Sequence, residues 1–395
     1  MNITEQGNDT QVPVQGISIE QVEAVVKREL PECWLPLEAC LSVISAAKLK
    51  DVHHCIGLIL VGQPGGRKGT TLSMLGSNDP IYRLDDFTPA SFVSADATKT
   101  PEQLSRIDLL PQIRHKILVV DELAPMFSKR YEDLVAGIGI TTKIMDGKGY
   151  WRATGTHGRR GYEGDYRFNM ICGTTPPEHK VWQALGKLSS RWIFYNLGKA
   201  TLTDDIRRDY GVALTECARV VQQFIEGFWQ EGYATEDWDR SQDSEELAEW
   251  LRWSADSTCK WRGLIQQQDS TGYNPPLIET PSRLRETLYA LARGHALLMG
   301  RHNIEGEDAT FAIDINQTNM PEDRYRLLQA YNHLVVEYIR NGGSCNDAHE
   351  FGMGLREAAR VIECSTDKAV KVFNELQDLG ILHYDDGTQK WYRAI

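Results

Sequence analysis

The stretch Gly57 to Leu75 reads GLILVGQPGGRKGTTLSML, and it decides the fold of this chain. It begins with the apolar run Leu58 to Val61, which predicts a buried strand. A glycine-rich turn follows, and then the opening of a helix. Such a turn brings backbone N–H groups and a helix N-terminus to one point, which suits an anionic phosphate group. The stretch therefore predicts an α/β domain with a phosphate-binding loop.

This loop has the spacing of a phosphate loop but departs from the pattern at two positions. Lys68 comes six residues after Gly62, as the pattern requires, so we expect it to reach the outer phosphates. Arg67 replaces a glycine of the pattern, and Gly69 replaces the hydroxyl residue that binds magnesium. Because Gly69 gives the backbone freedom, a one-residue shift of the turn would still bring a hydroxyl to the metal, and we take Thr70 as that ligand. The predicted nucleotide-binding residues are Gly62, Gly65, Gly66, Lys68, Gly69, Thr70 and Thr71.

A second apolar run, in Lys116 to Pro125 (KILVVDELAP), predicts a strand buried on both faces. Asp121 and Glu122 stand at its carboxyl end, the edge at which open parallel sheets bind ligands. We expect Asp121 to hold magnesium, directly or through water, and Glu122 to orient and polarise the attacking water. The alternatives are an ordinary strand-to-helix turn in the first stretch and a solvated acidic pair in the second.

Length and composition are those of a protein with two or three domains: 395 residues, of which 41% are hydrophobic. The sequence has neither an apolar run of about 18 residues nor a charged-then-apolar leader, so we expect a cytoplasmic protein without a membrane role. The eight cysteines lack paired spacing and indicate reduced thiols rather than disulfides or a zinc site. A formal net charge of −12 argues against coating nucleic acid over the whole surface, so any DNA contact should be local.

Residues 143–170 are rich in aromatic residues and glycines, which predicts a β-hairpin. We place one arm at 150–154 and a glycine-rich tip at Gly155, Gly158 and Gly161. Between residues 148 and 167 five lysines and arginines stand against two acids, so the hairpin is locally basic and suits a phosphate backbone. The alternative is a solvent-exposed hairpin with ordinary charges. The predicted nucleic-acid contacts are Lys148, Arg152, Arg159 and Arg160.

Two further positions have the chemistry of phosphoryl transfer. The strand that follows the hairpin ends at Thr174, where a small hydroxyl would meet the γ-phosphate. Arg191 precedes another apolar run, and an arginine there can stabilise charge on a transferring phosphoryl group, usually one bound by a neighbouring subunit. The alternative for Arg191 is a surface or salt-bridged arginine.

The order of these motifs resembles AAA+ ATPases of the clade with a hairpin before sensor 1, which contains the minichromosome-maintenance and superfamily-three replicative helicases. The Ser190-Arg191-Trp192 triplet resembles the minichromosome-maintenance arginine-finger motif, with tryptophan in place of phenylalanine. Pro281 to Ile313 is similar to that family's helical lid, in which Arg283 matches the sensor-2 arginine. Glu307-Asp308 matches the acidic pair that opens the next helix. The hairpin and the imperfect loop are most similar to those of ATPases from phages and mobile elements.

This resemblance implies an ATP- and Mg²⁺-dependent ring motor, a homo-oligomer that is a hexamer, with single-stranded DNA in its central pore. A replication initiator or a primase is the partner it implies. Thr174 would sense the γ-phosphate, and Arg191 would act across the subunit interface with Arg283 from the lid. A different class of function stays open, namely a nucleotide-dependent assembly or regulatory switch that turns over slowly.

Along the chain we predict a disordered N-terminus (1–16), a helical segment (17–50), the ATPase core (51–200), a helical lid (201–320) and a winged helix (321–395). The tryptophans of the lid are expected to anchor its core. A helix, a turn, a second helix and a strand pair after Gly343 give the winged-helix order. Its second helix carries Lys368 and Lys371. Residues 345–395 contain nine acidic and six basic residues, so the sequence is as consistent with a protein partner for this domain as with DNA.

Overall fold

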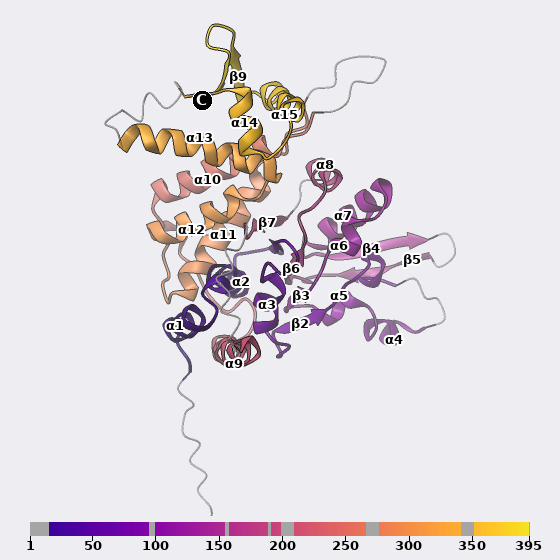
Figure 1. Ribbon diagram of the computed structural model, residues 1–395. Coiled ribbons are helices and arrows are strands. Elements are labelled where there is room, and N and C mark those ends of the chain that lie inside the picture. The colour runs from indigo at the N-terminus through magenta and orange to yellow at the C-terminus, as the bar shows by residue number, and fades with distance from the viewer. Residues whose placement is uncertain are drawn as a thin grey trace, which may run out of the picture.

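The computed structural model describes residues 16–94, 99–154, 158–188, 191–198, 209–265, 276–340 and 351–394. It shows a central sheet with helices on both sides, a helical region beside it, and a small C-terminal domain above that region (Figure 1). The predicted disordered N-terminus, except Gly16, lies outside the described residues. So do Gly155 of the hairpin tip and Ser190 of the arginine-finger triplet.

The central sheet has five parallel strands in the order β2-β3-β6-β1-β7. Their bounds are β1 Gly57–Val61, β2 Ile81–Leu84, β3 Ile117–Val120, β6 Asn169–Thr174 and β7 Trp192–Asn196. All residues of β1, β3 and β6 are buried, which explains why the sequences of β1 and β3 are continuous apolar runs rather than alternating ones. The predicted α/β class with a parallel sheet is therefore confirmed, and the carboxyl ends of β1, β6 and β3 lie side by side.

The helices of the N-terminal and core region are α1 Ile19–Glu29, α2 Trp34–Ala46, α3 Lys68–Met74, α4 Pro101–Ser105, α5 Leu109–Gln112, α6 Ala124–Phe127, α7 Tyr131–Ile144 and α8 His179–Leu188. Ser18 begins α1 with a capping box to Gln21. The sequence pattern predicts one helix over residues 102–113, and this is wrong, because α4 and α5 are separate. Pro111 has no N–H to donate to the carbonyl four residues before it, so a continuous helix would lose a hydrogen bond there.

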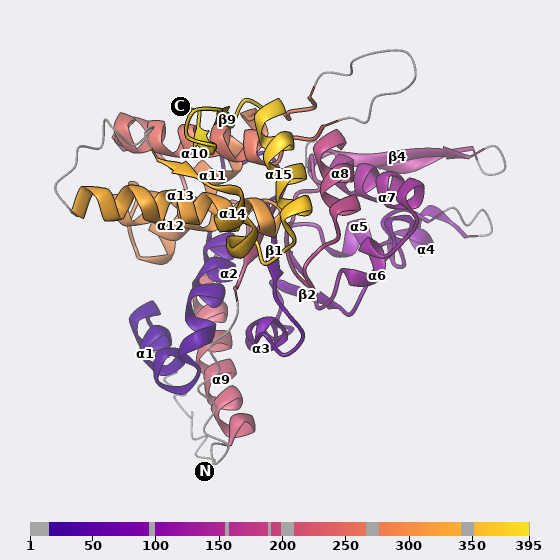
Figure 2. The same ribbon diagram turned by 45° about the horizontal axis from the view of Figure 1, so that its top comes forward.

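A hairpin of β4 Gly149–Thr154 and β5 Gly158–Glu163 projects from the core on the side away from α1 and α9 (Figures 1 and 2). The predicted tip needs correction, because Gly158 opens β5 and Gly161 lies within it, opposite Trp151. Gly161 is needed there for close approach of the two strands: a Cβ at this position would lie 2.1 Å from the Tyr150 carbonyl oxygen.

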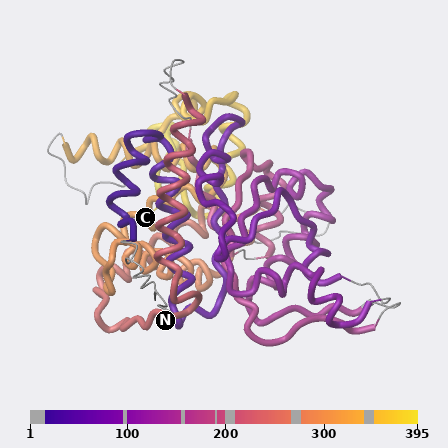
Figure 3. Tube along the Cα trace, turned by 90° about the horizontal axis from the view of Figure 1, so that it is seen from below, coloured from indigo at the N-terminus to yellow at the C-terminus, as the bar shows by residue number. Residues whose placement is uncertain are grey.

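The helices after the core are α9 Tyr210–Phe228, α10 Glu245–Trp261, α11 Ser282–Leu298 and α12 Gly306–Gln317. α9 packs against α1 and α3, and α12 packs against α10 and α11 (Figure 3). The lid over residues 201–320 stays a prediction. α11 lies close against α2, where a Cβ on Gly294 would be 2.2 Å from the Ser42 carbonyl oxygen. Trp250 and Trp253 are 45% and 63% exposed on the outer face of α10, so the prediction that the tryptophans anchor a core is wrong for these two.

The C-terminal domain contains α13 Glu322–Arg340, β8 Gly352–Met353, α14 Leu355–Val361, α15 Thr366–Asp378, β9 Leu382–Asp385 and β10 Lys390–Arg393. Its three strands form an antiparallel sheet in the order β8-β10-β9. Buried Arg324 of α13 donates to the carbonyl oxygens of Trp261 (2.7 Å) and Gly263 (2.6 Å), and it pairs with Glu375 of α15 at 3.1 Å. The domain is thereby fixed to the end of α10. Among the described residues, no helix has the length and apolarity needed to span a bilayer.

Candidate functional site

The carboxyl edge of the sheet brings together the ends of β1, β6 and β3. The Gly62 N–H donates to the Thr174 carbonyl at 3.1 Å, and the Leu123 N–H donates to the Gly173 carbonyl at 2.8 Å. A Cβ on Gly173 would lie 2.6 Å from the Asp121 carbonyl oxygen, so only glycine permits this approach. The predicted phosphate loop, the acidic pair and Thr174 therefore meet at one edge.

The phosphate loop keeps its bend although Arg67 replaces glycine. Arg67 is in the left-handed region, with φ 66° and ψ −1°, which costs a non-glycine residue about 1–2 kcal/mol. Its guanidinium stacks 4.4 Å from the ring centroid of Tyr210, and its Nε lies 3.2 Å from Glu32 Oε1. These contacts offset the strain. α3 begins at Lys68, so Gly69 lies in its first turn.

Lys68 and Glu122 are brought together at this edge. The Lys68 Nζ atom lies 3.3 Å from Glu122 Oε2, and the Ala124 N–H donates to Glu122 Oε1 at 3.1 Å. Thr174 is 1% exposed, and its Oγ1 has no hydrogen-bond partner within the described part of the chain. A buried hydroxyl without a partner costs free energy, so a ligand oxygen at this edge would stabilise it.

Asp121 has an unpredicted partner, Arg83 of β2. Arg83 donates from Nη2 to Asp121 Oδ1 at 2.5 Å and from Nε to Oδ2 at 3.3 Å, and its Nη1 donates to the Leu72 carbonyl of α3 at 2.9 Å. The sequence signal was a charged residue near the carboxyl end of a strand. The residues fit a phosphate group better than a magnesium ion, because Arg83 engages both Asp121 oxygens and Gly69 supplies no hydroxyl.

A cavity of about 180 Å³ opens beside the phosphate loop. Much of its wall is apolar. Its lining comes from the short 3-10 turn before α2, the start of α2, the loop and the end of β7: Pro31, Glu32, Leu35, Pro36, Gly66, Arg67, Tyr195, Asn196 and Leu197. A small cavity with apolar walls next to a phosphate loop has the shape and chemistry to take a planar nucleobase.

Arg191 and Arg283 lie at the opposite, amino edge of the sheet. The Gly57 N–H, at the first residue of β1, donates to the Arg191 carbonyl at 3.2 Å. Arg191 Nη2 donates to Asp146 Oδ1 at 2.9 Å, and Arg283 Nη2 lies 3.8 Å from the same oxygen. Burial raises the pKa of Asp146, but hydrogen bonds from Arg191 and from Lys143 outweigh it and hold that pKa below its ordinary value. The structure thus brings the two arginines to each other and not to Lys68 of the same chain.

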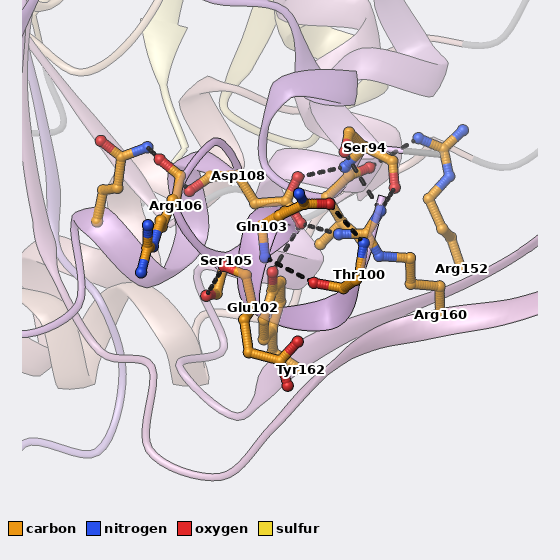
Figure 4. A network of polar contacts seen from close by, with 12 residues as sticks. Ser94, Thr100, Glu102, Gln103, Ser105, Arg106, Asp108, Arg152, Arg160 and Tyr162 are labelled. Carbon is orange, nitrogen blue, oxygen red and sulfur yellow. Dashed lines mark hydrogen bonds and ion pairs between the residues drawn. The ribbon is translucent and has the colours of Figure 1, made fainter. Parts of the chain in front are cut away.

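The four predicted nucleic-acid residues differ in their contacts. Arg152 donates to the Val93 carbonyl at 3.0 Å, and Arg160 donates to the Ser94 carbonyl at 2.7 Å and to Asp108 at 2.5 Å (Figure 4). Asp108 is fully buried and also accepts a hydrogen bond from Tyr162. These two arginines therefore hold the hairpin to the core, whereas Lys148 and Arg159 are exposed.

A magnesium requirement can be tested at Gly69. A Cβ there would meet no atom within 4 Å, so Gly69→Thr should place a hydroxyl in the first turn of α3 without strain. We expect Mg²⁺ to strengthen nucleotide binding about tenfold more in Gly69→Thr than in the natural protein. Calorimetric titration with and without EDTA measures the difference. Gly69→Ala is the matched control, because it changes the helix propensity but adds no hydroxyl, and an equal gain in both variants would contradict a metal at this position.

Comparison with known proteins gives likenesses to solved structures but shows no family. No protein-family model matches the sequence, and no curated protein matches it. The fold is similar to the crystal structure of a full-length MCM homolog from Methanopyrus kandleri, with a TM-score of 0.44 and 11% sequence identity. The match covers 76% of this chain and 59% of that one, so the chain spans less than two thirds of that relative. A TM-score below 0.5 carries no argument about function, which rests on the site geometry alone.

Proposed function

We propose that the protein is an ATP-hydrolysing motor of the AAA+ type that acts on DNA as a hexameric replicative helicase. The observation that carries this proposal is the 3.3 Å contact between Lys68 and Glu122 at the sheet edge that also holds the Thr174 hydroxyl, which has no hydrogen-bond partner among the described residues. These are a phosphate-binding cation, an acceptor for a water proton, and a donor for a phosphate oxygen, all at the sheet edge where ligands bind.

In this proposal the outer phosphates of ATP attract Lys68 and draw it away from Glu122. The Glu122 carboxylate, still oriented by the Ala124 N–H, is then available to accept a hydrogen bond from the attacking water. Thr174 donates to a γ-phosphate oxygen. A magnesium ion could be held by Asp121 and Thr70 only after Asp121 has released Arg83, and it would then neutralise phosphate charge. The base would occupy the cavity beside the loop.

Ring assembly would complete the site. Arg191 and Arg283 lie at the amino edge, so they can reach a nucleotide only on another subunit. Arg191 Nη1 is buried and has no hydrogen-bond partner among residues that the structure describes, so a phosphate oxygen from a neighbour would satisfy it. A contact between the amino edge of one subunit and the carboxyl edge of the next is heterologous, and such contacts form a ring where the rotation between subunits closes.

The C-terminal domain has the element order of a winged helix, and we propose that it contacts a protein partner such as an initiator or primase. Lys368, in the first turn of α15, lines a crevice of about 460 Å³ against Trp182 of the core, together with the carboxylates of Glu322, Asp323 and Glu363. Arg326 lines the same crevice and pairs with Glu322 and, at 2.9 Å, with Glu363, so the start of the second helix faces the ATPase core across a crevice with little net charge. Such a surface does not attract a DNA backbone.

The second candidate function is a nucleotide-dependent switch with slow turnover. The pairing of Arg83 with Asp121 favours it, because an engaged Asp121 is a poor metal ligand.

Strand displacement separates the two functions. A motor should unwind a forked DNA duplex with ATP, and its particle mass should rise to that of a ring when ATP and single-stranded DNA are both present. A protein that binds ATP and changes its mass but displaces no strand would be a switch.

A further inference from the structure

The outer face of the β4–β5 hairpin carries a large aromatic side chain with an arginine stacked on it. Trp151 is 42% exposed, and the guanidinium of Arg159 lies 4.4 Å from its ring centroid. The register pairs Trp151 with Gly161 and Arg159 with Ala153, so only small residues lie across from the two side chains. Trp151 is thus part-exposed, and the described residues paired with it and with Arg159 across the hairpin add no second large apolar side chain to this face.

The opposite face of the hairpin fixes the orientation of this pair. Side chains alternate between the two faces of the hairpin, so residues 152, 160 and 162 lie on the face opposite residues 151, 159 and 161. Arg152, Arg160 and Tyr162 point inward, to the carbonyls of Val93 and Ser94 and to the buried carboxylate of Asp108 (Figure 4). A side chain held on a rigid element loses little conformational entropy when a ligand binds. The exposed pair is thus preorganised.

We propose that Trp151 and Arg159 form a stacking platform for one base of single-stranded DNA, with Arg159 also contacting the adjacent phosphate. This inference rests on the proposed function and names the binding mode within it. Trp151 is the one large apolar side chain on this face among the described residues of the hairpin, and a single flat ring matches the face of a base, whereas a protein partner would need a contiguous apolar area. The positive charge beside the ring complements a phosphate, and an arginine stacked on an aromatic ring can still donate hydrogen bonds from the edge of its own guanidinium plane.

The test is the affinity of the full-length protein for a fluorescent oligodeoxythymidine, measured by anisotropy over a range of salt concentrations. Trp151→Ala should weaken binding about tenfold at every salt concentration, since stacking is not a charge interaction. Arg159→Ala should weaken binding and also flatten the salt dependence by a slope of about 0.7, the loss of one phosphate contact. Trp151→Phe should recover part of the affinity.

An abasic oligonucleotide of equal length supplies the decisive comparison. The natural protein should bind it more weakly than oligodeoxythymidine, and Trp151→Ala should bind both alike. Trp253→Ala, which removes another exposed tryptophan far from the hairpin, is the matched control and should bind as the natural protein does.

Several outcomes would overturn the platform. Equal preference for bases in the natural protein and in Trp151→Ala would exclude stacking. A change in particle mass on Trp151→Ala without DNA would make this face a contact between subunits. If the natural protein binds no single-stranded DNA at all, both the stacking platform and the proposed motor function are contradicted. If Trp151→Ala binds DNA as tightly as the natural protein does, only the stacking platform is contradicted.

Discussion

Lys68→Ala is expected to weaken ATP binding about 100-fold, whereas Glu122→Gln should leave binding intact and stop turnover. The lysine supplies a charge-assisted bond to the phosphates, worth about 1.5–3 kcal/mol. Glutamine is nearly isosteric with glutamate but cannot accept the proton of the attacking water, so the turnover rate should fall by a factor of about 10² to 10⁴. Binding of a fluorescent ATP analogue and release of phosphate measure the two effects separately.

The 3.3 Å contact between these residues provides an internal control. Glu122→Gln also frees Lys68 from a neighbouring carboxylate, so ATP affinity in this variant should equal or exceed that of the natural protein. Equal losses of ATP affinity in both variants would refute the assignment of binding to Lys68 and of water activation to Glu122. A lower melting temperature in either variant would indicate that the two residues form an ion pair that stabilises the fold.

A mixture of Arg191→Ala and Glu122→Gln subunits is expected to recover ATPase activity that neither variant has alone. If Arg191 acts on the nucleotide of a neighbour, some interfaces in a mixed ring combine a natural Glu122 with a natural Arg191. Removing an arginine that stabilises the transferring phosphoryl group typically costs a factor of about 10³ to 10⁵. Phosphate release across a series of mixing ratios measures the recovery.

Asp146→Asn is the control for this experiment, because Asp146 holds Arg191 at 2.9 Å. If the arginine only ties the start of β7 to Asp146, then Arg191→Ala and Asp146→Asn should lower the melting temperature equally and no mixture should recover activity. If Arg191 acts in trans, Asp146→Asn should retain ATPase activity. Full activity in Arg191→Ala alone would contradict the trans role.

The sequence was sufficient to predict the sheet edge because its signals are local. An apolar run followed by glycines or carboxylates identifies a buried strand and its carboxyl end, so the meeting of Lys68 with Glu122 followed from position alone. Arg83 was missed because its partner Asp121 lies on another strand. Strand order, and not sequence separation, puts them together.

The orientation of the hairpin also depends on a residue that is distant in the sequence. Its pleat places Arg152 and Arg160 on one face and Trp151 and Arg159 on the other, and the sequence contains that alternation. Which face points inward depends on Asp108, a buried carboxylate in the connection between α4 and α5. The count of basic residues therefore predicts the same role for all four. In the structure Arg152 and Arg160 bond to the core, whereas Lys148 and Arg159 are exposed.

The three hydrogen bonds of Arg324 govern how the chain can be dissected. Trp261 of α10 belongs to the same apolar cluster as Leu327 and Tyr331 of α13 and Trp391 of β10, and Arg324 ties the polar groups around that cluster together. A chain cut near residue 341 would keep the arginine and the apolar side of α13 but lose the surfaces that cover them. The exposed remainder would favour aggregation, so loss of function after such a cut would report solubility rather than recognition. The C-terminal domain therefore contributes to the stability of the rest of the chain. Its role has to be tested by substitutions on its surface and not by deletion.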